Sequence, residues 1–410
     1  MTVKLADIQD AGKVLQDIIN PTPIISDEKL SDEIGSRAYL KAEGLQRAGS
    51  FKIRGAYNTI SRLSDDEKKR GVVTGSAGNH AQAVALAAKL LGIKATIVLP
   101  EFAPLTKVVA TRSYGAEAVL HGATFDEAVA YSRELERKHG YIYIHAFDDE
   151  RVIAGQGTIG LEIADVLPQA TVIVVPIGGG GLISGIAIAV KSLIPNVRVI
   201  GVQAENVAPV NLSLKAGKPL EAKHQPTIAD GIAVKRPGVL TLPIIRDFVD
   251  EVVEVSEEEI ARGIFHCAQN AHLVVEGAGA AGVAALIAKK VKLRSDDTVC
   301  AVLCGGNIDG NLLNRVIEQV LVRQGRYVVF KLLVLDRPGS LAAMLNEVAT
   351  SGANVVEINH QRAIWLAPLG YTGIEMILEV RDESHGREVH KHLEDAGYNV
   401  ERQGQGDWEE

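Results

Sequence analysis

The feature that most constrains the fold is an alternation of short apolar runs with amphipathic helical patterns, from about residue 38 to residue 325. The runs are rich in valine and isoleucine, as at residues 94–99 and 171–175. Strands this apolar are buried on both faces, and a helix between consecutive strands produces a parallel connection. The alternation therefore predicts an α/β protein whose parallel sheets are covered by helices on both faces.

The positions of the expected elements follow from the two hydrophobic periodicities. Strands are predicted at residues 38–42, 71–74, 94–99, 171–175 and 197–202. Helices are predicted at residues 79–91 and 105–114, at residues 124–139 behind a capping box of Thr124 and Glu127, and from Leu182 onward.

The pattern changes near residue 325. Strands are predicted at 327–335, 354–359, 373–380 and 398–400, with helices at about 341–351 and 384–396. This order, βαββαβ, is that of a small ferredoxin-like domain. Because 410 residues exceed one ordinary core, we predict a first domain at 1–325, with a smaller lobe at about 50–150, and a second domain at 326–410.

Composition excludes several classes of function. The net charge of −8 argues against a nucleic-acid partner, and no apolar run is long enough to span a membrane. No signal peptide is predicted from the first residues. Three cysteines, without a CxxC pair, favour a reducing cytoplasm over a disulfide framework. The histidines form no HExxH motif, so no metal site is expected.

Lys52 stands among small residues where a helix is predicted to begin. The positive end of the helix dipole disfavours an ammonium group there. A neutral lysine amine is a nucleophile that forms Schiff bases with carbonyl compounds. The alternative is a surface lysine whose stem lies along the protein.

Four consecutive glycines follow the strand at 171–175 and precede a helix: Gly178, Gly179, Gly180 and Gly181. Glycines let backbone N–H groups converge, and the helix N-terminus attracts an anion, so the loop is typical of a phosphate cradle. One alternative is a dinucleotide fingerprint, with Glu205 as the ribose-binding acid, which would make the chain a nicotinamide-dependent oxidoreductase. The other is a tight turn without a ligand.

Two further loops follow apolar strands. The first contains Ser76, Ala77, Gly78, Asn79 and His80, and suits a carboxylate or a phenolic oxygen, although Asn79 could be a simple helix cap. The second contains Cys304, which on its own reads as a small buried hydrophobe. Ligands of open parallel sheets bind beyond the carboxyl ends of the strands. A lysine and a phosphate cradle at that edge together indicate pyridoxal phosphate, which has both a carbonyl and a phosphate.

These motifs resemble the fold-type-II (tryptophan synthase β-like) pyridoxal-phosphate enzymes, most closely the threonine/serine dehydratases. The resemblance covers about residues 1–325 and rests on Ser50-Phe-Lys-Ile-Arg-Gly55, Ser76-Ala-Gly-Asn-His80, Gly178 to Gly181 and Cys304-Gly-Gly-Asn307. The tail with Asp336-Arg-Pro-Gly-Ser-Leu341 is similar to an ACT domain, an amino-acid-sensing regulatory module.

The resemblance implies a role for each residue. Lys52 would bind the cofactor covalently and move the α-proton, and Phe51 would pack on the ring. Gly178 to Gly181 and the Leu182 amide would hold the phosphate, Asn79 the ring hydroxyl, and the loop from Ser76 to His80 the substrate carboxylate. Cys304 would face the pyridine nitrogen. The implied reaction is β-elimination of L-threonine and L-serine to a 2-oxo acid and ammonia.

Departures from relatives refine this expectation. Serine racemases have a serine where this chain has Ala77, so elimination is expected without racemisation. Relatives that bind a divalent ion use acidic residues after the strand at 197–202, where only Glu205 remains, so no metal is expected. Serine racemase, threonine synthase, cysteine synthase and a non-catalytic amino-acid sensor stay as alternatives.

The tail implies regulation. Asp336, Gly339, Leu341 and Asn354 would grip an amino-acid effector such as isoleucine or valine, as in allosteric control of isoleucine biosynthesis. The alternative is an ACT fold kept only for oligomerisation. A homo-oligomer, dimer or tetramer, is expected because such domains pair edge to edge.

Overall fold

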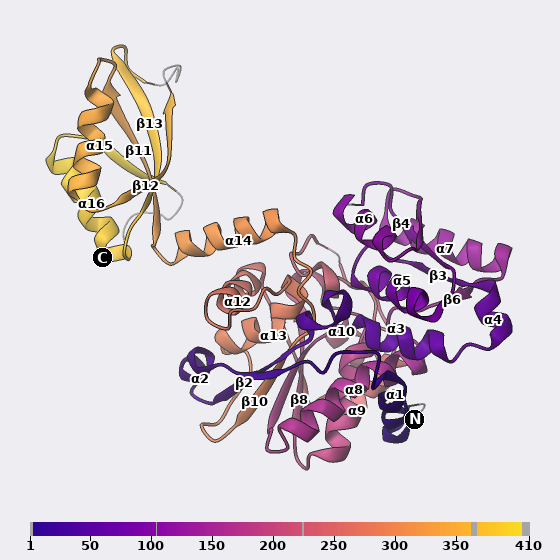
Figure 1. The fold of residues 1–410 in the computed structure, drawn as a ribbon. Helices are drawn as coiled ribbons and strands as arrows, with labels where there is room; N and C mark the ends of the chain where they lie inside the picture. The colour runs from indigo at the N-terminus through magenta and orange to yellow at the C-terminus, as the bar shows by residue number, and fades with distance from the viewer. Residues whose placement is uncertain (1–2, 104, 224, 362–366, 404–410) are drawn as a thin grey trace. The chain divides into compact units, whose positions relative to one another are not determined.

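We describe a computed structural model of the chain, which covers residues 3–103, 105–223, 225–361 and 367–403. The chain divides into two compact units, Met1–Ile308 and Asp309–Glu410 (Figure 1). Each unit is described by itself.

The first unit is built on two sheets. In the described residues the larger sheet has six strands in the order β1-β2-β10-β7-β8-β9. Strand β1 pairs antiparallel to β2, and the other pairs are parallel. The bounds are β1 Ile24–Ser26, β2 Arg37–Ala42, β7 Val172–Pro176, β8 Arg198–Ala204, β9 Glu251–Val255 and β10 Thr298–Leu303.

The second sheet of this unit is parallel throughout, in the order β5-β4-β3-β6. Every residue of β3, β4, β7 and β10 is buried, as expected for strands covered on both faces. The bounds are β3 Val72–Gly75, β4 Ala95–Leu99, β5 Glu117–Leu120 and β6 Ile142–Tyr143.

Helices cover both faces of both sheets. On the larger sheet, α12 and α13 lie on one face, and α1, α8 and α9 lie on the other (Figure 1). On the smaller sheet, α7 packs on one face of β3 and β4, and α3 and α5 belong to the core on the opposite face. The helices are α1 Leu5–Leu15, α2 Glu28–Ile34, α3 Lys52–Ser61, α4 Asp65–Arg70, α5 Asn79–Leu91, α6 Leu105–Ser113, α7 Phe125–His139, α8 Glu150–Val166, α9 Gly181–Leu193, α10 Pro209–Ala216, α11 Thr241–Phe248, α12 Glu257–Gln269 and α13 Gly277–Ile287.

The second unit begins with helix α14, Gly310–Arg323, and continues as a βαββαβ fold. Its antiparallel sheet has the order β12-β13-β11-β14, and the buried core includes Phe330, Met344 and Met376. The elements are β11 Tyr327–Leu335, α15 Ser340–Thr350, β12 Asn354–Gln361, β13 Tyr371–Glu379, α16 Glu383–Asp395 and β14 Val400–Gln403. The predicted ferredoxin-like arrangement is thereby confirmed.

The last strand was placed too early by the sequence. We predicted it at residues 398–400, and it lies at Val400–Gln403. Gly397 adopts a left-handed conformation with φ of +89°, and the Tyr398 N–H donates to the carbonyl of Leu393. Tyr398 thus still completes the end of helix α16, which delays the strand.

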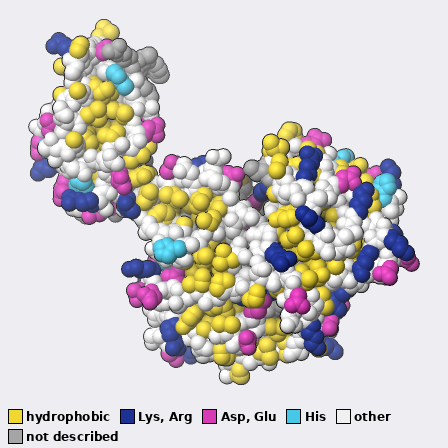
Figure 2. All heavy atoms as spheres, viewed as in Figure 1, with side chains coloured by type: hydrophobic (Ala, Val, Ile, Leu, Met, Phe, Trp, Pro, Cys, Tyr) yellow, Lys and Arg dark blue, Asp and Glu magenta, His cyan; other side chains and the backbone are white. Residues whose placement is uncertain are grey.

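The surface shows charges of both signs. On the face drawn in Figure 2, basic and acidic side chains are interspersed among polar and apolar ones. In the part of the chain that the structure describes, we find no helix with the length and apolar character needed to cross a membrane.

Candidate active site

Lys52 is the first residue of α3, as the sequence predicts. Strand β2 ends at Ala42, and two short 3₁₀ turns, the second at Arg47–Gly49, carry the chain to the helix start. The Phe51 N–H donates to the carbonyl of Cys304 at 3.1 Å, and Ser50 pairs with Gly305 as an isolated bridge. The lysine is thereby anchored beside the carboxyl end of β10.

The Lys52 amine loses its proton more readily than that of an ordinary lysine. Its Nζ donates to the carbonyl of Ala146 at 3.0 Å and lies 5.0 Å from the centre of the Phe51 ring. Burial lowers the pKa of Lys52 to about 8, against opposing effects of Cys304 and Glu276. Desolvation disfavours the ammonium form, so a much larger fraction of this amine is neutral near pH 7 than of an ordinary lysine.

The glycine loop connects β7 to α9 and ends at an uncapped helix. Gly180 is the N-cap, with φ of +98° and no side-chain cap, so the first amides of α9 receive no capping side chain. A Cβ on Gly179 would lie 2.4 Å from the Phe147 ring, and one on Gly181 would lie 2.8 Å from the Phe147 carbonyl. The Thr241 hydroxyl donates to the Gly179 carbonyl at 2.7 Å and fixes the loop. Only glycine fits, and the backbone amides stay open to an anion, so the loop fits a phosphate group.

The asparagine loop connects β3 to α5. The Ser76 N–H donates to the Val98 carbonyl, and the Ser76 hydroxyl accepts from Gly78 N–H at 3.3 Å. Gly78 is the N-cap of α5, and no atom lies within 4 Å of where its Cβ would project. The loop therefore has open space beside Gly78.

His80 turns its side chain away from that space. Its Nε2 lies 3.0 Å from the Ile144 carbonyl, and the side chain is buried. Burial, and then the nearby Lys52, lower the pKa of His80 to about 3. The imidazole is neutral at any working pH and fastens the loop to the end of β6.

Two parts of the site were missed by the sequence analysis. One is Glu276, which is only 5 % exposed and accepts a hydrogen bond from Asn79 Nδ2 at 2.6 Å. Burial, and then Asp230, raise the pKa of Glu276 to about 7. Its partner lies 197 positions away in the sequence. A glutamate before a glycine-rich helix carries no local signal of that contact.

The other part is the segment after β6. The Ala146 carbonyl holds Lys52, and the next residue, Phe147, packs on the glycine loop. His145 Nδ1 accepts from the N–H groups of Phe147 and Asp148, at 3.2 and 2.8 Å, and its ring meets the Phe147 ring edge-on at 4.7 Å. This segment links the lysine to the glycine loop. The run His145-Ala-Phe-Asp-Asp149 after a short strand was its only sequence signal.

Cys304 lies at the end of β10, with 3 % of its surface exposed. Burial raises the pKa of the Cys304 thiol well above its usual range. Its sulfur is therefore a neutral thiol beside Lys52.

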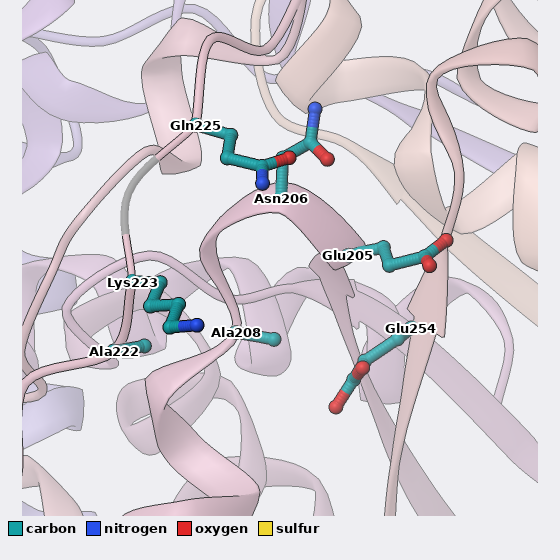
Figure 3. A pocket seen from close by; sticks show the side chains of 7 residues that line it. All are labelled: Glu205, Asn206, Ala208, Ala222, Lys223, Gln225 and Glu254. Carbon is teal, nitrogen blue, oxygen red and sulfur yellow. The ribbon is translucent and has the colours of Figure 1, made fainter.

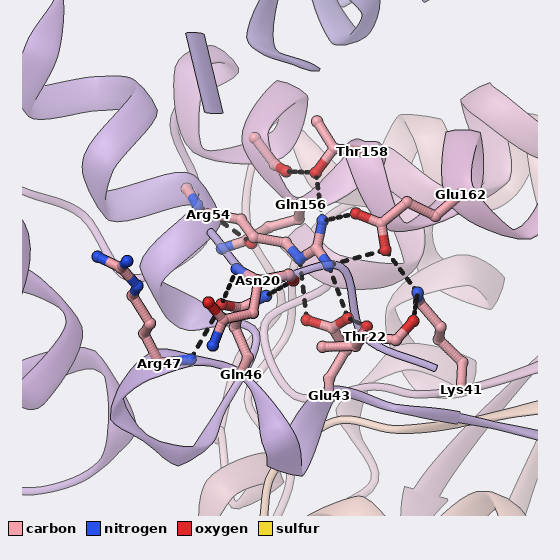
Figure 4. A network of polar contacts seen from close by, with 12 residues as sticks. Asn20, Thr22, Lys41, Glu43, Gln46, Arg47, Arg54, Gln156, Thr158 and Glu162 are labelled. Atoms are coloured by element: carbon pink, nitrogen blue, oxygen red, sulfur yellow. Dashed lines mark hydrogen bonds and ion pairs between the residues drawn. The ribbon is translucent and has the colours of Figure 1, made fainter. Parts of the chain in front are cut away.

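A buried ion network lies two residues beyond the lysine (Figure 4). The fully buried Arg54 binds Glu43 through two nitrogens, at 2.8 and 2.9 Å, and donates to Thr158 at 3.0 Å. It also binds Glu162, which in turn accepts from Lys41. Burial works against the charge, but Glu43 and Glu162 raise the pKa of Arg54 above its usual value. The network ties the first turn of α3 to α8 and β2.

A hollow of about 350 Å³ lies elsewhere in this unit, beyond the end of β8 (Figure 3). Glu205 lines it, but the predicted cofactor and substrate residues do not: the lining is Glu205, Asn206, Ala208, Ala222, Lys223, Gln225 and Glu254. Among the described residues, no group of three or more His, Cys, Asp or Glu is placed to hold a metal ion.

The four predicted effector residues lie in the second unit. Asp336 follows β11, with its N–H donating to the Gly370 carbonyl, and Gly339 is the N-cap of α15 with φ of +89°. Leu341 packs against the core of this unit, and Asn354 begins β12, with its Nδ2 3.4 Å from Glu379 Oε2. The start of α15 has no side-chain cap.

The geometry of the first unit defines a class of protein. A lysine of lowered pKa, a glycine cradle and an asparagine loop follow the carboxyl ends of parallel strands, where such sheets bind cofactors. Residues 15–305 match the family described as pyridoxal-phosphate dependent enzyme. The chain belongs to this family.

Individual relatives agree. The chain is 49 % identical over 398 residues to an L-threonine ammonia-lyase of Thermotoga maritima, with 97 % of this chain and 99 % of the relative covered. Among solved structures, threonine deaminase isoform 2 of Solanum lycopersicum matches with a TM-score of 0.73 and 40 % identity, over 77 % of this chain and 91 % of that one. Maize serine racemase matches with a TM-score of 0.74 and 35 % identity, over 79 % and 99 %.

The lowered pKa of Lys52 predicts how cofactor uptake depends on pH. Only the neutral amine attacks an aldehyde, so the rate at which cofactor-free protein binds pyridoxal phosphate should rise with pH and reach half its maximum near pH 8. Stopped-flow absorbance measures this rate. The rate found with the Lys52→Ala variant, which reports reaction at surface lysines, is subtracted from it. A midpoint near the ordinary lysine value of 10.5 would contradict the assigned environment.

Proposed function

We propose that this protein catalyses the β-elimination of L-threonine, and of L-serine, to a 2-oxo acid and ammonia. The observation that carries the proposal is the end-to-end match to an L-threonine ammonia-lyase, which includes both units of the chain. The site chemistry agrees with it. A nicotinamide-dependent oxidoreductase would leave Lys52 and the asparagine loop without a role.

Pyridoxal phosphate supplies an aldehyde that takes up the substrate amine and a ring that withdraws electrons from its Cα. The amides from Gly178 to Leu182 would hold its phosphate, Asn79 its ring hydroxyl, and Phe51 its ring. Cys304, kept neutral by burial, would face the pyridine nitrogen without holding a proton on it, which favours direct loss of the leaving group from Cβ.

The protein's own groups perform the proton transfer. Lys52 Nζ would act as the base that removes the proton from Cα. The Ala146 carbonyl keeps Nζ at the edge of the site. The loop from Ser76 to His80 would bind the substrate carboxylate. The proton lost from Cα and the hydroxyl lost from Cβ together make one water, and the resulting enamine takes up one water to give 2-oxobutyrate and ammonia when threonine is the substrate.

The nearest alternative is a serine racemase, because a solved serine racemase has the same fold at 35 % identity. Racemisation needs a proton donor on the face of Cα opposite the lysine. Ala77 has no transferable proton at the position where racemases carry a serine. Lys52 is then the only proton carrier that we assign at Cα, which favours elimination.

The test uses the purified protein loaded with pyridoxal phosphate. L-threonine should yield 2-oxobutyrate and ammonia in equal amounts, and L-serine should yield pyruvate, with chiral chromatography detecting no D-serine. D-serine at a rate comparable to pyruvate would instead assign a racemase. A colourless protein that binds NAD would overturn the assignment to this reaction.

Regulation is a second component of the proposal. The βαββαβ unit and its uncapped α15 suit an ACT domain in which Asp336, Gly339, Leu341 and Asn354 bind an amino-acid effector, with edge pairing of a homo-oligomer. Isoleucine or valine, added to the same assay, tests this component. The three buried free cysteines suit a reducing cytoplasm.

A further inference from the structure

A series of hydrogen bonds runs through the side chain of Asn79 and connects three loops of the site. Asn307, from the loop after β10, donates through Nδ2 to the Ala48 carbonyl and to Asn79 Oδ1, at 2.8 Å each. Asn79 Nδ2 in turn donates to Glu276 Oε1 at 2.6 Å. Ala48 lies just before the Lys52 helix, so these hydrogen bonds join the lysine segment to the asparagine loop.

These contacts leave one orientation for the Asn79 amide. The Ala48 carbonyl only accepts hydrogen bonds, so it fixes the NH₂ group of Asn307 toward it and toward Asn79. If the Asn79 amide were turned over, its NH₂ would face the NH₂ of Asn307, and its oxygen would face the Glu276 carboxyl oxygen. Because a backbone carbonyl does not titrate, this orientation persists across pH.

The surrounding backbone is shaped for this arrangement. Ala48 has φ of +59°, a conformation that is unfavourable for a residue with a side chain, and a Cβ on Gly49 would lie 2.3 Å from Asn307 Oδ1. A Cβ on Gly305 would lie 2.3 Å from Glu276 Oε1. Gly49, directly before the lysine motif, therefore makes room for Asn307, and Gly305, in the Cys304 motif, makes room for Glu276.

Glu276 also gives up a local role. It is the N-cap residue of α13, but its side chain makes no capping bond to the first amides of that helix. It reaches instead to Asn79, in the other sheet's loop. Local stability of α13 does not account for this contact.

We propose that Asn307 and Glu276 are positioning residues that hold the Asn79 amide in a single orientation, with one N–H group left to bind the phenolic oxygen of the cofactor. The inference rests on the proposed role of Asn79. Asn307 and Glu276 act through Asn79 and need not touch the cofactor.

The test exchanges hydrogen-bond donors for acceptors at the two side chains that contact Asn79. Asn307→Asp removes both donors and places a carboxylate against two acceptors, so Asn79 turns over and its oxygen meets Glu276. Adding Glu276→Gln supplies a donor to that oxygen and satisfies the turned amide. The single variant should lose thermal stability, and the double variant should regain part of it, because the Ala48 carbonyl still lacks its donor.

The affinity for the cofactor distinguishes a loss of Asn79 orientation from a loss of folding stability. In both variants the Kd for pyridoxal phosphate, from equilibrium dialysis, should rise about tenfold, the loss expected for one hydrogen bond of about 1.4 kcal/mol. The absorption band of the bound cofactor should shift in both. Recovery of cofactor affinity along with stability in the double variant would overturn the inference, as would a wild-type Kd and spectrum in Asn307→Asp.

A matched control is Asn211→Asp. Asn211 Nδ2 also donates to a backbone carbonyl and a carboxylate, those of Val252 and Glu254, at 3.2 Å each. This variant should lose stability without changing the cofactor's Kd or spectrum. If the wild-type protein binds no pyridoxal phosphate, the proposed function fails. If the wild-type protein binds it and Asn307→Asp and the double variant bind it with the same Kd and spectrum, the inference alone fails.

Discussion

Replacing Lys52 with alanine should abolish the conversion of L-threonine to 2-oxobutyrate, with a loss of kcat of about 10⁴-fold or more. Proton transfer by a positioned side chain is worth about 10²–10⁴, and the same residue also makes the covalent bond to the cofactor. Coupled 2-oxobutyrate reduction measures the rate. Mass spectrometry after borohydride treatment should find the cofactor attached to wild-type protein and absent from the variant.

The control for this substitution is Lys94→Ala. Lys94 is an exposed lysine that pairs with Glu117 at 3.1 Å on the surface. Its loss should leave activity and borohydride labelling unchanged. If Lys52→Ala keeps more than about a hundredth of the wild-type rate, another group removes the α-proton and the mechanism above is wrong.

Replacing Arg54 with methionine should lower the free energy of unfolding by about 3–5 kcal/mol, because it leaves the buried Glu43 carboxylate without a counter-charge, while Glu162 keeps its ion pair with Lys41. Glu43 is fully buried, and Glu162 is 27 % exposed. Urea unfolding of the full chain, followed by circular dichroism, measures the change. Adding Glu43→Gln should recover part of the loss, because it removes the uncompensated charge of Glu43.

Arg62→Met is the matched control for Arg54. Arg62 follows the same helix and pairs with Asp10 at 2.6 Å, with the two side chains 32 % and 56 % exposed. Solvent-screened pairs of this kind contribute about 0–1 kcal/mol. Equal destabilisation by the two substitutions would show that the Arg54 network does not behave as a buried ion cluster.

The sequence predicted those parts of the site whose signals are local. The glycine loop and the start of α3 at Lys52 were found because strand, loop and helix start are adjacent in the chain. The order βαββαβ of the second unit was found for the same reason, since each element has its own periodicity. The last strand was misplaced, because Gly397 is left-handed and the Tyr398 N–H still donates to the Leu393 carbonyl in the last turn of α16.

The sequence could not predict contacts between distant side chains. Glu276 read as an ordinary residue before a glycine-rich helix, and Arg54 as a basic residue on a helix. Their partners, Asn79 for the one and Glu43 and Glu162 for the other, are known only once the loops and helices are placed in space.

The sequence alone thus determined the fold class and the cofactor, and it singled out Lys52 as the candidate lysine, because periodicity and strand-end motifs depend on neighbouring residues. The tertiary structure decided the state in which those groups work. Burial, which only the folded chain produces, lowers the pKa of Lys52 to about 8, and it does so more strongly than the opposing Cys304 and Glu276. The orientation of Asn79 likewise depends on Asn307, 228 positions away, because a hydrogen bond requires two groups to meet in space.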